Sequence, residues 1–331
     1  MKVRIIGTGS WGTALGQVLA DNGQDVKMYG LSIEEVNDIN LNHQNSKFFN
    51  DVLINPNLEA SNDFDIVKDA DVVLLGVPVM AIDSVCQRLK ETLDHKVHVI
   101  NVAKGFHPVT KERLSLAITR IMGDKLEDFV SLIGPSHAEE VILRKLTIVN
   151  SVCENEEVAK SIQKLFANDY FRVYTNSDVI GAEIAAATKN VMAIASGCLA
   201  GINEGDNARA ALMTRGLAEM TRFGLALGAK KETFLGLNGV GDLIVTCSSY
   251  HSRNFQAGLE IGKANGAKEF LLNNKKTTEG INTCRVVKEL ADEMKIDMPI
   301  TNEVYEVLFN DKKPTEAIKG LMTRPLKAEE L

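Results

Sequence analysis

A glycine-rich loop near the start of the chain constrains the possible fold more than any other feature. Residues 7–12 read Gly-Thr-Gly-Ser-Trp-Gly, directly after an apolar run at residues 3–6 and before a helical pattern at residues 13–22. In such a strand–loop–helix unit, the first glycine permits a tight turn and the second lets a pyrophosphate approach the backbone. The third lets the helix pack closely on the strand. The loop therefore favours a dinucleotide site over an ordinary strand-to-helix turn. Its candidate contacts are Gly7, Gly9, Gly12 and, as a cover over bound cofactor, Trp11.

Six further apolar runs alternate with helical stretches through the first half of the chain. They span residues 26–29, 71–77, 97–102, 129–133, 146–149 and 171–174. Continuous apolar strands separated by helices are typical of a mostly parallel sheet that is covered on both faces. Residues 31–62 are less regular and rich in Asn, which favours a loop over part of that range. We predict an α/β fold with a Rossmann-type, mostly parallel sheet.

Strand patterns end near residue 178, and helical spacing dominates the rest of the chain. The expected helices span residues 182–199, 207–227, 254–264, 283–294, 302–309 and 315–322. Residues 175–178 read Thr-Asn-Ser-Asp, which favours a turn and a helix N-cap, so we place a short linker there. The chain is thus predicted to form a dinucleotide-binding domain at residues 1–178. An all-helical substrate-binding and catalytic domain is predicted at residues 179–331.

The composition is that of an ordinary globular protein and excludes several classes. Of 331 residues, 45% are hydrophobic and 24% are charged, with a formal net charge of −7. These values rule out disorder and collagen, and the acidic balance argues against a nucleic-acid binder. No apolar run approaches the roughly 18 residues that cross a bilayer, and no signal-peptide pattern opens the chain. We expect a cytoplasmic protein that binds neither membrane nor nucleic acid.

The cysteines and histidines give no sign of a metal site. The cysteines include no C-x-x-C pair, and His95 and His98 join no carboxylate cluster. We expect reduced and mostly buried thiols at Cys86, Cys153, Cys198, Cys247 and Cys284.

The end of the second strand ordinarily distinguishes NAD from NADP. An acidic residue there accepts a hydrogen bond from the ribose 2′-hydroxyl, whereas an arginine holds a 2′-phosphate. The sequence there is Tyr29-Gly30-Leu31-Ser32, with neither residue type. Ser32 could donate to a phosphate, although a surface serine is the commoner explanation. The choice between NAD and NADP stays open.

Three strand ends offer a second cluster of candidate residues. Gly76-Val77-Pro78, Ala103-Lys104-Gly105 and Gly134-Pro135-Ser136 each follow an apolar run. Ligands of open α/β sheets bind outside the carboxyl ends of the strands. We therefore expect Lys104 to face a phosphate or the cofactor, with Gly134 and Ser136 in the same crevice. A solvated lysine is the alternative for Lys104.

Five motifs in order give the chain a resemblance to a known family. They are the glycine loop, Gly134-Pro135-Ser136, the block of residues 189–194 with 207–220, Gly239-Val240-Gly241-Asp242-Leu243, and Ser252-Arg253-Asn254. The chain resembles the bacterial NAD(P)-dependent glycerol-3-phosphate dehydrogenases over essentially its whole length. This resemblance implies a Rossmann-type domain followed by a helical domain. It also implies interconversion of sn-glycerol 3-phosphate and dihydroxyacetone phosphate, feeding phospholipid synthesis, and a homodimer would fit it.

The resemblance also implies roles for individual residues. Lys189 matches the general acid/base. The implied substrate contacts are Lys104, Gly134, Ser136, Lys189, Asp242, Ser252, Arg253 and Asn254. Beside the loop glycines, the implied cofactor contacts are Ser10, Trp11, Lys104, Ala138, Arg253, Thr277 and Glu279. The family often carries Arg or another polar residue where Leu31 stands, and Phe or Tyr where His137 stands. Cofactor choice and the lining of the crevice therefore stay open.

The surroundings of Lys189 suit acid/base chemistry. Its neighbours at i−4, i−3, i+3 and i+4 are Ala185, Ala186, Met192 and Ala193, none of them an acid. A lysine stripped of water without a local ion pair favours the neutral amine, which can remove an alcohol proton. A lysine that snorkels from a partly apolar helix is the alternative.

A phosphate site is expected where the helix at residues 254–264 starts. Ser252 is a good N-cap, and the helix amides together with the Arg253 guanidinium can grip an anion. Asp242 is expected in a Gly-rich loop before this helix. Its carboxylate could orient Lys189 or a substrate hydroxyl, or serve only as a turn or cap residue.

Two other functions remain compatible with the sequence. A related two-domain dehydrogenase could use Arg253 to bind the carboxylate of a hydroxy acid. A nucleotide-sensing protein without catalysis would share the glycine loop, although it need not keep Lys104, Lys189 and Arg253.

Overall fold

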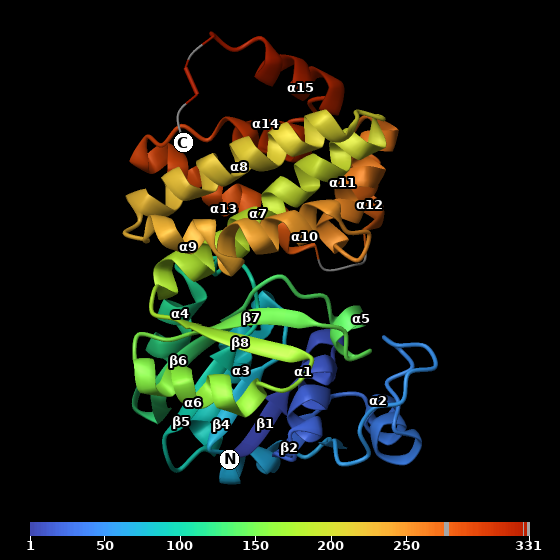
Figure 1. Ribbon diagram of the computed structural model, residues 1–331, viewed down its shortest axis with the longest axis vertical. Coiled ribbons are helices and arrows are strands. Elements are labelled where there is room, and N and C mark those ends of the chain that lie inside the picture. The colour runs from blue at the N-terminus through green and yellow to red at the C-terminus, as the bar shows by residue number, and fades with distance from the viewer. Residues whose placement is uncertain (275–277, 327, 330–331) are drawn as a thin grey trace. The chain divides into compact units, whose positions relative to one another are not determined.

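The computed structural model describes residues 1–274, 278–326 and 328–329, which form two compact units (Figure 1). Unit 1 comprises Met1–Ala103 and Glu112–Val179, and unit 2 comprises Lys104–Lys111 and Ile180–Leu331. The main boundary lies next to the expected linker. No sequence pattern indicated the early crossing at Lys104–Lys111, where Phe106 is only 2% exposed within the core of unit 2. The functions assigned to the two parts stay predictions.

Unit 1 is built on an eight-stranded sheet with the order β3-β2-β1-β4-β5-β6-β7-β8. Its strands are β1 (Lys2–Ile6), β2 (Asp25–Tyr29), β3 (Glu59–Ser61), β4 (Val72–Leu75), β5 (Val97–Asn101), β6 (Leu126–Ile133), β7 (Thr147–Val152) and β8 (Phe171–Asn176). Neighbouring strands pair in parallel, except that β6 and β7 are antiparallel. The expected mostly parallel sheet is therefore confirmed.

Helices cover both faces of this sheet, because successive residues of a strand point to opposite sides. Val72 and Leu74 of β4 join one apolar cluster, whereas Val73 and Leu75 join another. The first cluster includes side chains of α1 (Ser10–Asp21), α5 (Ala138–Val141) and α6 (Glu156–Phe166). The second includes side chains of α3 (Ile82–Thr92) and α4 (Leu114–Met122). Burial on both sides explains why the strand sequences are continuously apolar.

The Asn-rich range 31–62 contains more regular structure than expected. It holds the short helix α2 (Ile33–Asn37), a π-helical turn at Asp38–Asn42 and the strand β3. These elements are short, and β3 has only three residues, so no period could be recognised in the sequence.

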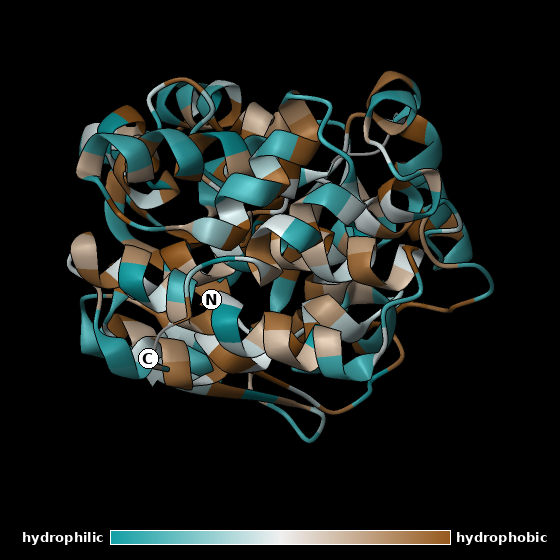
Figure 2. Cartoon of the chain, turned by 90° about the horizontal axis from the view of Figure 1, so that it is seen from above, coloured by the Kyte–Doolittle hydropathy of each residue, from teal (hydrophilic) through white to brown (hydrophobic). Residues whose placement is uncertain are grey.

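Unit 2 is helical in its described residues. Its helices are α7 (Val179–Gly201), α8 (Asp206–Ala226), α9 (Lys231–Leu235), α10 (Asp242–Ser248), α11 (Arg253–Ala264), α12 (Lys268–Asn273), α13 (Glu279–Met294), α14 (Pro299–Phe309) and α15 (Pro314–Met322). All six expected helices are confirmed, and α9, α10 and α12 were missed. Hydrophilic and hydrophobic residues alternate along the ribbons, as amphipathic helices require (Figure 2).

The long helix α7 is apolar enough, by length and composition, to cross a membrane. Its sequence contains no continuous apolar run of that length, because Lys189 and other polar residues interrupt it. However, 83% of its most apolar window is buried within the protein. The core helix of a soluble protein passes the same test, so this composition is weak evidence for a membrane span.

Glycines let α7 and α11 cross with their backbones in close contact. A Cβ atom on Gly201 would lie 2.5 Å from the carbonyl oxygen of Leu259. Cβ atoms on Gly197, Gly258 and Gly262 would come closer still to carbonyl oxygens of the facing helix. The crossing therefore fixes the spacing of the two helices that carry Lys189 and Arg253.

All five cysteines are buried free thiols, as expected.

Candidate active site

The glycine loop follows β1 and joins it to α1. The N–H of Gly7 donates to the carbonyl oxygen of Tyr29 at 2.8 Å, which ties the loop to the end of β2. Gly7 has a φ of +108°, and a Cβ there would lie 2.6 Å from the Gly76 carbonyl oxygen. A Cβ on Gly12 would lie 2.7 Å from the carbonyl oxygen of Gly7. The fold of unit 1 itself therefore requires glycine at both positions.

Gly9 differs from its two neighbours in the motif. A Cβ there would find only the Gly76 carbonyl oxygen within 4 Å, at 3.8 Å, which is ordinary contact. Gly9 is also the N-cap of α1, with no side-chain cap and no acidic residue in the first turn. The first amides of α1 thus have no side-chain cap, and the opening beside Gly9 gives an anion room to approach them. This arrangement suits a pyrophosphate.

The other predicted cofactor and substrate residues of unit 1 have structural contacts. Trp11 is half-buried and packs against the core cluster under α1. Gly134 follows β6, where a Cβ would lie 2.8 Å from the Cα of Val149 in β7. Ser136 donates to the Gly134 carbonyl oxygen at 3.0 Å, and Ala138 begins α5. The contact roles implied for them, and for half-buried Ser10, stay predictions.

In unit 2, one buried carboxylate is shared by two lysines. Asp242 begins α10, and its Oδ2 lies 3.2 Å from Nζ of Lys104, in the segment Lys104–Lys111. Its Oδ1 pairs with Nζ of Lys189 from the middle of α7. The Asp242 side chain is fully buried, and those of Lys189 and Lys104 are 4% and 17% exposed. Three residues far apart in sequence thus form one charged cluster with two cations and one anion.

Thr246 completes this cluster, and sequence reasoning missed it. Nζ of Lys189 donates to Oγ1 of Thr246 at 2.8 Å, and that hydroxyl donates to the backbone carbonyl oxygen of Asp242 at 2.6 Å. Asp242 was expected in a loop, whereas it starts a helix. Recognising α10 would have placed Thr246 one turn after Asp242, on the same face.

Lys189 has no ion pair within its own helix, as expected, and Asp242 is the carboxylate that orients it, which was one of the alternatives for that residue. Its neighbours along α7 are apolar, as expected, but Asp242 reaches it from α10. Burial nevertheless lowers the pKa of Lys189, the charge of Asp242 opposes this and that of Lys104 adds to it, and the net pKa is about 7. The balance brings the amine within range of proton exchange near neutral pH.

The N-termini of α11 and α13 meet in unit 2. Oγ of Ser252 accepts from the N–H of Phe255 at 3.2 Å, so the predicted N-cap is confirmed, and Arg253 stands exposed in the first turn. Oδ1 of Asn254 accepts from the N–H of Gly280 at 2.9 Å, which links α11 to α13. This bond gives Asn254 a structural role that the sequence did not indicate.

Glu279, immediately before Gly280, is the first residue of α13. Burial raises the pKa of its carboxyl, and the cations of Arg253, Lys104 and Lys189 oppose that rise. Glu279 therefore belongs to the electrostatic environment of the charged cluster. Thr277, the remaining predicted cofactor contact, lies outside the described residues.

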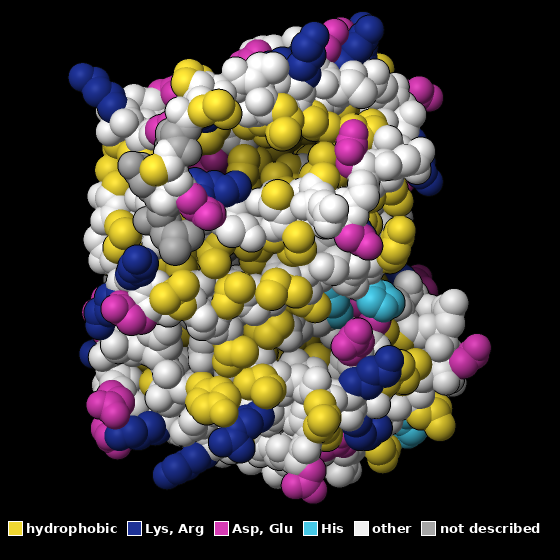
Figure 3. Space-filling view, turned by 45° about the horizontal axis from the view of Figure 1, so that its top comes forward, with side chains coloured by type: hydrophobic (Ala, Val, Ile, Leu, Met, Phe, Trp, Pro, Cys, Tyr) yellow, Lys and Arg dark blue, Asp and Glu magenta, His cyan; other side chains and the backbone are white. Residues whose placement is uncertain are grey.

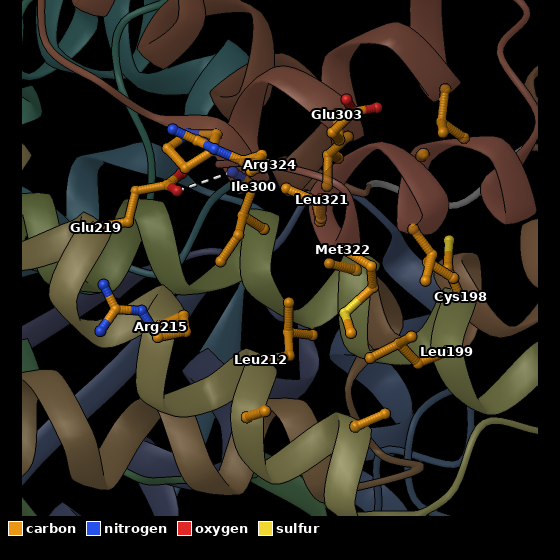
Figure 4. Close-up of a pocket in the computed structure, with 18 of the residues that line it drawn as sticks. Cys198, Leu199, Leu212, Arg215, Glu219, Ile300, Glu303, Leu321, Met322 and Arg324 are labelled. Carbon is orange, nitrogen blue, oxygen red and sulfur yellow. Dashed lines mark hydrogen bonds between the residues drawn. The ribbon is translucent and has the colours of Figure 1, made fainter. Parts of the chain in front are cut away.

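Unit 2 also contains an apolar pocket of about 370 Å³ between α7, α8, α14 and α15 (Figure 4). Leu212, Ile300 and Leu321 line it, and Glu219 accepts from the N–H of Ile300 at 2.8 Å at its edge. A space-filling view shows hydrophobic side chains around a hollow with charged groups at its rim (Figure 3). None of the described residues lining the pocket is a predicted site residue. The charged cluster therefore remains the better candidate for catalysis.

Comparison with known proteins agrees with this geometry. Residues 2–159 match the family described as NAD-dependent glycerol-3-phosphate dehydrogenase N-terminus, and residues 178–319 match the corresponding C-terminus. The chain is 44% identical to a Streptococcus sanguinis protein (strain SK36) over 99% of this chain and 97% of that protein. That relative is named glycerol-3-phosphate dehydrogenase, NAD(P)+. The chain belongs to the NAD-dependent glycerol-3-phosphate dehydrogenase family.

Other members support the assignment to this dehydrogenase family. An Enterococcus faecalis protein of the same name is 45% identical over 99% of this chain and 97% of its own length. The crystal structure of glycerol-3-phosphate dehydrogenase from Coxiella burnetii has a TM-score of 0.91 and 34% identity. The match covers 98% of this chain and 99% of that one. The resemblance inferred from five motifs is confirmed.

Proposed function

We propose that this chain interconverts sn-glycerol 3-phosphate and dihydroxyacetone phosphate by hydride transfer with NAD or NADP. It thereby supplies glycerol 3-phosphate for phospholipid synthesis. The observation that carries this proposal is the buried cluster of Lys189, Asp242 and Lys104, in a member of a glycerol-3-phosphate dehydrogenase family. A protein that only senses nucleotides has no need of a buried lysine with a lowered pKa.

The glycine loop fits a nicotinamide dinucleotide. Gly7, Gly9 and Gly12 would hold the pyrophosphate against the first amides of α1, in the opening beside Gly9. When bound, the nicotinamide accepts or delivers the hydride. Ser10, Trp11 and Ala138 are proposed as further contacts, together with Lys104, Arg253 and Glu279 of unit 2.

Lys189 is the proposed general acid/base. An ammonium has three N–H donors, and Lys189 directs two of them to Asp242 and Thr246. The third is left for the oxygen of the substrate. In alcohol oxidation the neutral amine takes the hydroxyl proton, and in ketone reduction the ammonium returns it to the carbonyl oxygen. Asp242 and Thr246 hold the amine in place during both steps.

Arg253 is the proposed phosphate ligand. Its guanidinium stands at the first turn of α11, where the amides and the helix dipole also favour an anion. Ser252 and Asn254 flank it and are proposed as substrate contacts, as are Lys104, Gly134 and Ser136. Asn254 could contribute its side-chain N–H₂, because its Oδ1 is used by Gly280.

The decisive experiment measures NADH and NADPH oxidation with dihydroxyacetone phosphate and, separately, with a series of 2-keto acids. Turnover confined to dihydroxyacetone phosphate supports the proposal. Preferential turnover of 2-keto acids would instead identify a hydroxy-acid dehydrogenase, and no turnover would leave a nucleotide-sensing protein. We further propose a cytoplasmic homodimer, which light scattering of the purified protein and cell fractionation would test.

A further inference from the structure

The segment after β2 lies directly beside the glycine loop. Tyr29, the last residue of β2, accepts the hydrogen bond from Gly7 described above. Leu31 follows, with 87% of its surface exposed and no charge to offer. In folds of this kind, the residues after the second strand meet the adenosine ribose, where NAD carries a 2′-hydroxyl and NADP a 2′-phosphate.

Glu35 of α2 reaches back to the glycine loop. The hydroxyl of Thr8, between Gly7 and Gly9, donates to Oε2 of Glu35 at 2.5 Å. Oε1 of Glu35 pairs with Nζ of Lys47 at 2.5 Å. The Glu35 side chain is only 12% exposed, so these two bonds hold its carboxylate firmly. The ion pair also neutralises Lys47, which would otherwise be a cation available to a phosphate.

Ser32 is engaged by a second carboxylate. Its hydroxyl donates to Oε2 of Glu34 at 2.6 Å, and Oγ of Ser32, the N-cap of α2, accepts from the N–H of Glu35. The Ser32 hydroxyl is therefore already engaged. It is not available to donate to a 2′-phosphate, which was the role that the sequence left open for it. The hydrogen bond from Ser32 also lowers the pKa of Glu34, so this carboxylate is charged at neutral pH.

The hollow next to these residues is lined by more acids than bases. Its charged lining consists of Glu34, Glu35, Asp38 and Lys47. A 2′-hydroxyl can donate to a carboxylate there. A 2′-phosphate would bring about two further negative charges to a lining whose three acids outnumber its one lysine, which is paired with Glu35. Repulsion of this kind disfavours NADP without weakening any contact to NAD.

We propose that this enzyme prefers NAD to NADP, and that Glu34 and Glu35 determine the preference. The inference rests on the proposed function, and it names the cofactor that the same site takes. The discrimination comes from the acidic residues that line the hollow, and from the bonds that tie Lys47 to Glu35 and Ser32 to Glu34. An arginine for a 2′-phosphate is missing at Leu31.

The test measures dissociation constants of NAD⁺ and NADP⁺ by calorimetry, without substrate. Wild type is expected to bind NAD⁺ at least about tenfold more tightly, which corresponds to one close charge interaction. Glu35→Gln frees Lys47 and is expected to shift the affinity ratio toward NADP⁺ by about tenfold. Leu31→Arg is expected to shift it in the same direction without touching Glu35. Raising the salt concentration should reduce the wild-type ratio, because it screens exposed charges.

Glu59→Gln is the matched control. Glu59 is an exposed acid at the start of β3, paired with Lys27 of β2, and it does not line the hollow, so this change removes the same charge and frees a lysine outside the proposed site. It should leave the affinity ratio unchanged. Equal affinities in wild type, tighter NADP⁺ binding, or equal shifts in Glu35→Gln and Glu59→Gln would overturn the inference. Wild type that binds neither dinucleotide would instead overturn the proposed function.

Discussion

The glycine loop of unit 1 and the charged cluster of unit 2 are built in opposite ways. The loop is made of consecutive backbone atoms, and its defining property is the absence of side chains at Gly7, Gly9 and Gly12. The cluster is made of side chains from distant segments, with Lys104 and Asp242 separated by 138 positions. A loop of the first kind fails when atoms are added, whereas a cluster of the second kind fails when atoms or charges are removed.

The largest effect is expected from Lys189→Met, which removes the proposed acid/base and nearly keeps the volume. General acid/base catalysis typically raises the rate about 100- to 10,000-fold, so kcat should fall by at least about 100-fold. Dinucleotide affinity should change little, because the glycine loop belongs to unit 1. Steady-state kinetics and NADH fluorescence titration measure the two quantities. Near-normal turnover in the variant would contradict the assignment of Lys189.

Gly9→Val tests the opposite kind of site by adding atoms. A Cβ at Gly9 has room in the protein, so the variant should fold and unfold at about the wild-type temperature. Overpacking costs about 1–3 kcal/mol, so dinucleotide affinity should fall by up to about 100-fold. Calorimetric titration with NAD⁺ measures this loss.

Gly12→Val provides the contrast within the same motif. Its Cβ would meet the Gly7 carbonyl oxygen, so it should lower the thermal stability of the protein as well as cofactor binding. If Gly9→Val destabilised the fold as much as Gly12→Val, the opening beside Gly9 would not be a ligand site.

Arg253 tests whether the anion site of unit 2 depends on charge or on geometry. Arg253→Ala should lower kcat/KM for dihydroxyacetone phosphate by about tenfold or more, since each hydrogen bond to a charged group contributes about 1.5–3 kcal/mol. Arg253→Lys should be intermediate, because it keeps the charge and loses the bidentate fork. Activity with unphosphorylated dihydroxyacetone serves as the internal comparison. Equal losses with both substrates would show that Arg253 does not hold the phosphate.

The smallest effect expected is a pH dependence set by the cluster. Because burial lowers the pKa of Lys189 to about 7, kcat/KM for glycerol 3-phosphate should rise about tenfold between roughly pH 6 and 8. The same shift affects stability. At pH values between the folded pKa of about 7 and the ordinary lysine pKa of 10.5, the unfolded chain holds a proton on Lys189 that the folded chain lacks. The contribution of Lys189 to the free energy of unfolding therefore increases as the pH rises.

Urea unfolding of wild type and Lys189→Met across this pH range measures the second effect. The stability difference between them should change in favour of wild type as pH rises above 7. The contrary result would be a kcat/KM that rises only near pH 10, together with a stability difference that does not change with pH. It would show that the ion pair with Asp242 keeps Lys189 fully protonated.

The sheet of unit 1 was predictable because each of its long strands is a continuous apolar run. The strand β3 was not, because three residues carry no measurable period. In unit 2, the glycines at 236, 239 and 241 suggested a loop and concealed α10, and Thr246 was missed with it. The residues of the charged cluster were recognisable by family resemblance. The pairing of Asp242 with Lys189 was one of the alternatives. The pairing of Asp242 with Lys104 was not foreseen, because it depends on the crossing of Lys104–Lys111 into unit 2.

The early crossing of the chain into unit 2 limits how this enzyme can be divided or recombined. A fragment that ends at residue 178 would carry Lys104–Lys111 away from its partners and expose Phe106 to water. The complementary fragment would have a gap in its core and would leave Asp242 with only Lys189 to neutralise it. A single cut or fusion point therefore cannot exchange the two units as modules between proteins. Any chimaera that moves the charged cluster must move two separate stretches of sequence together.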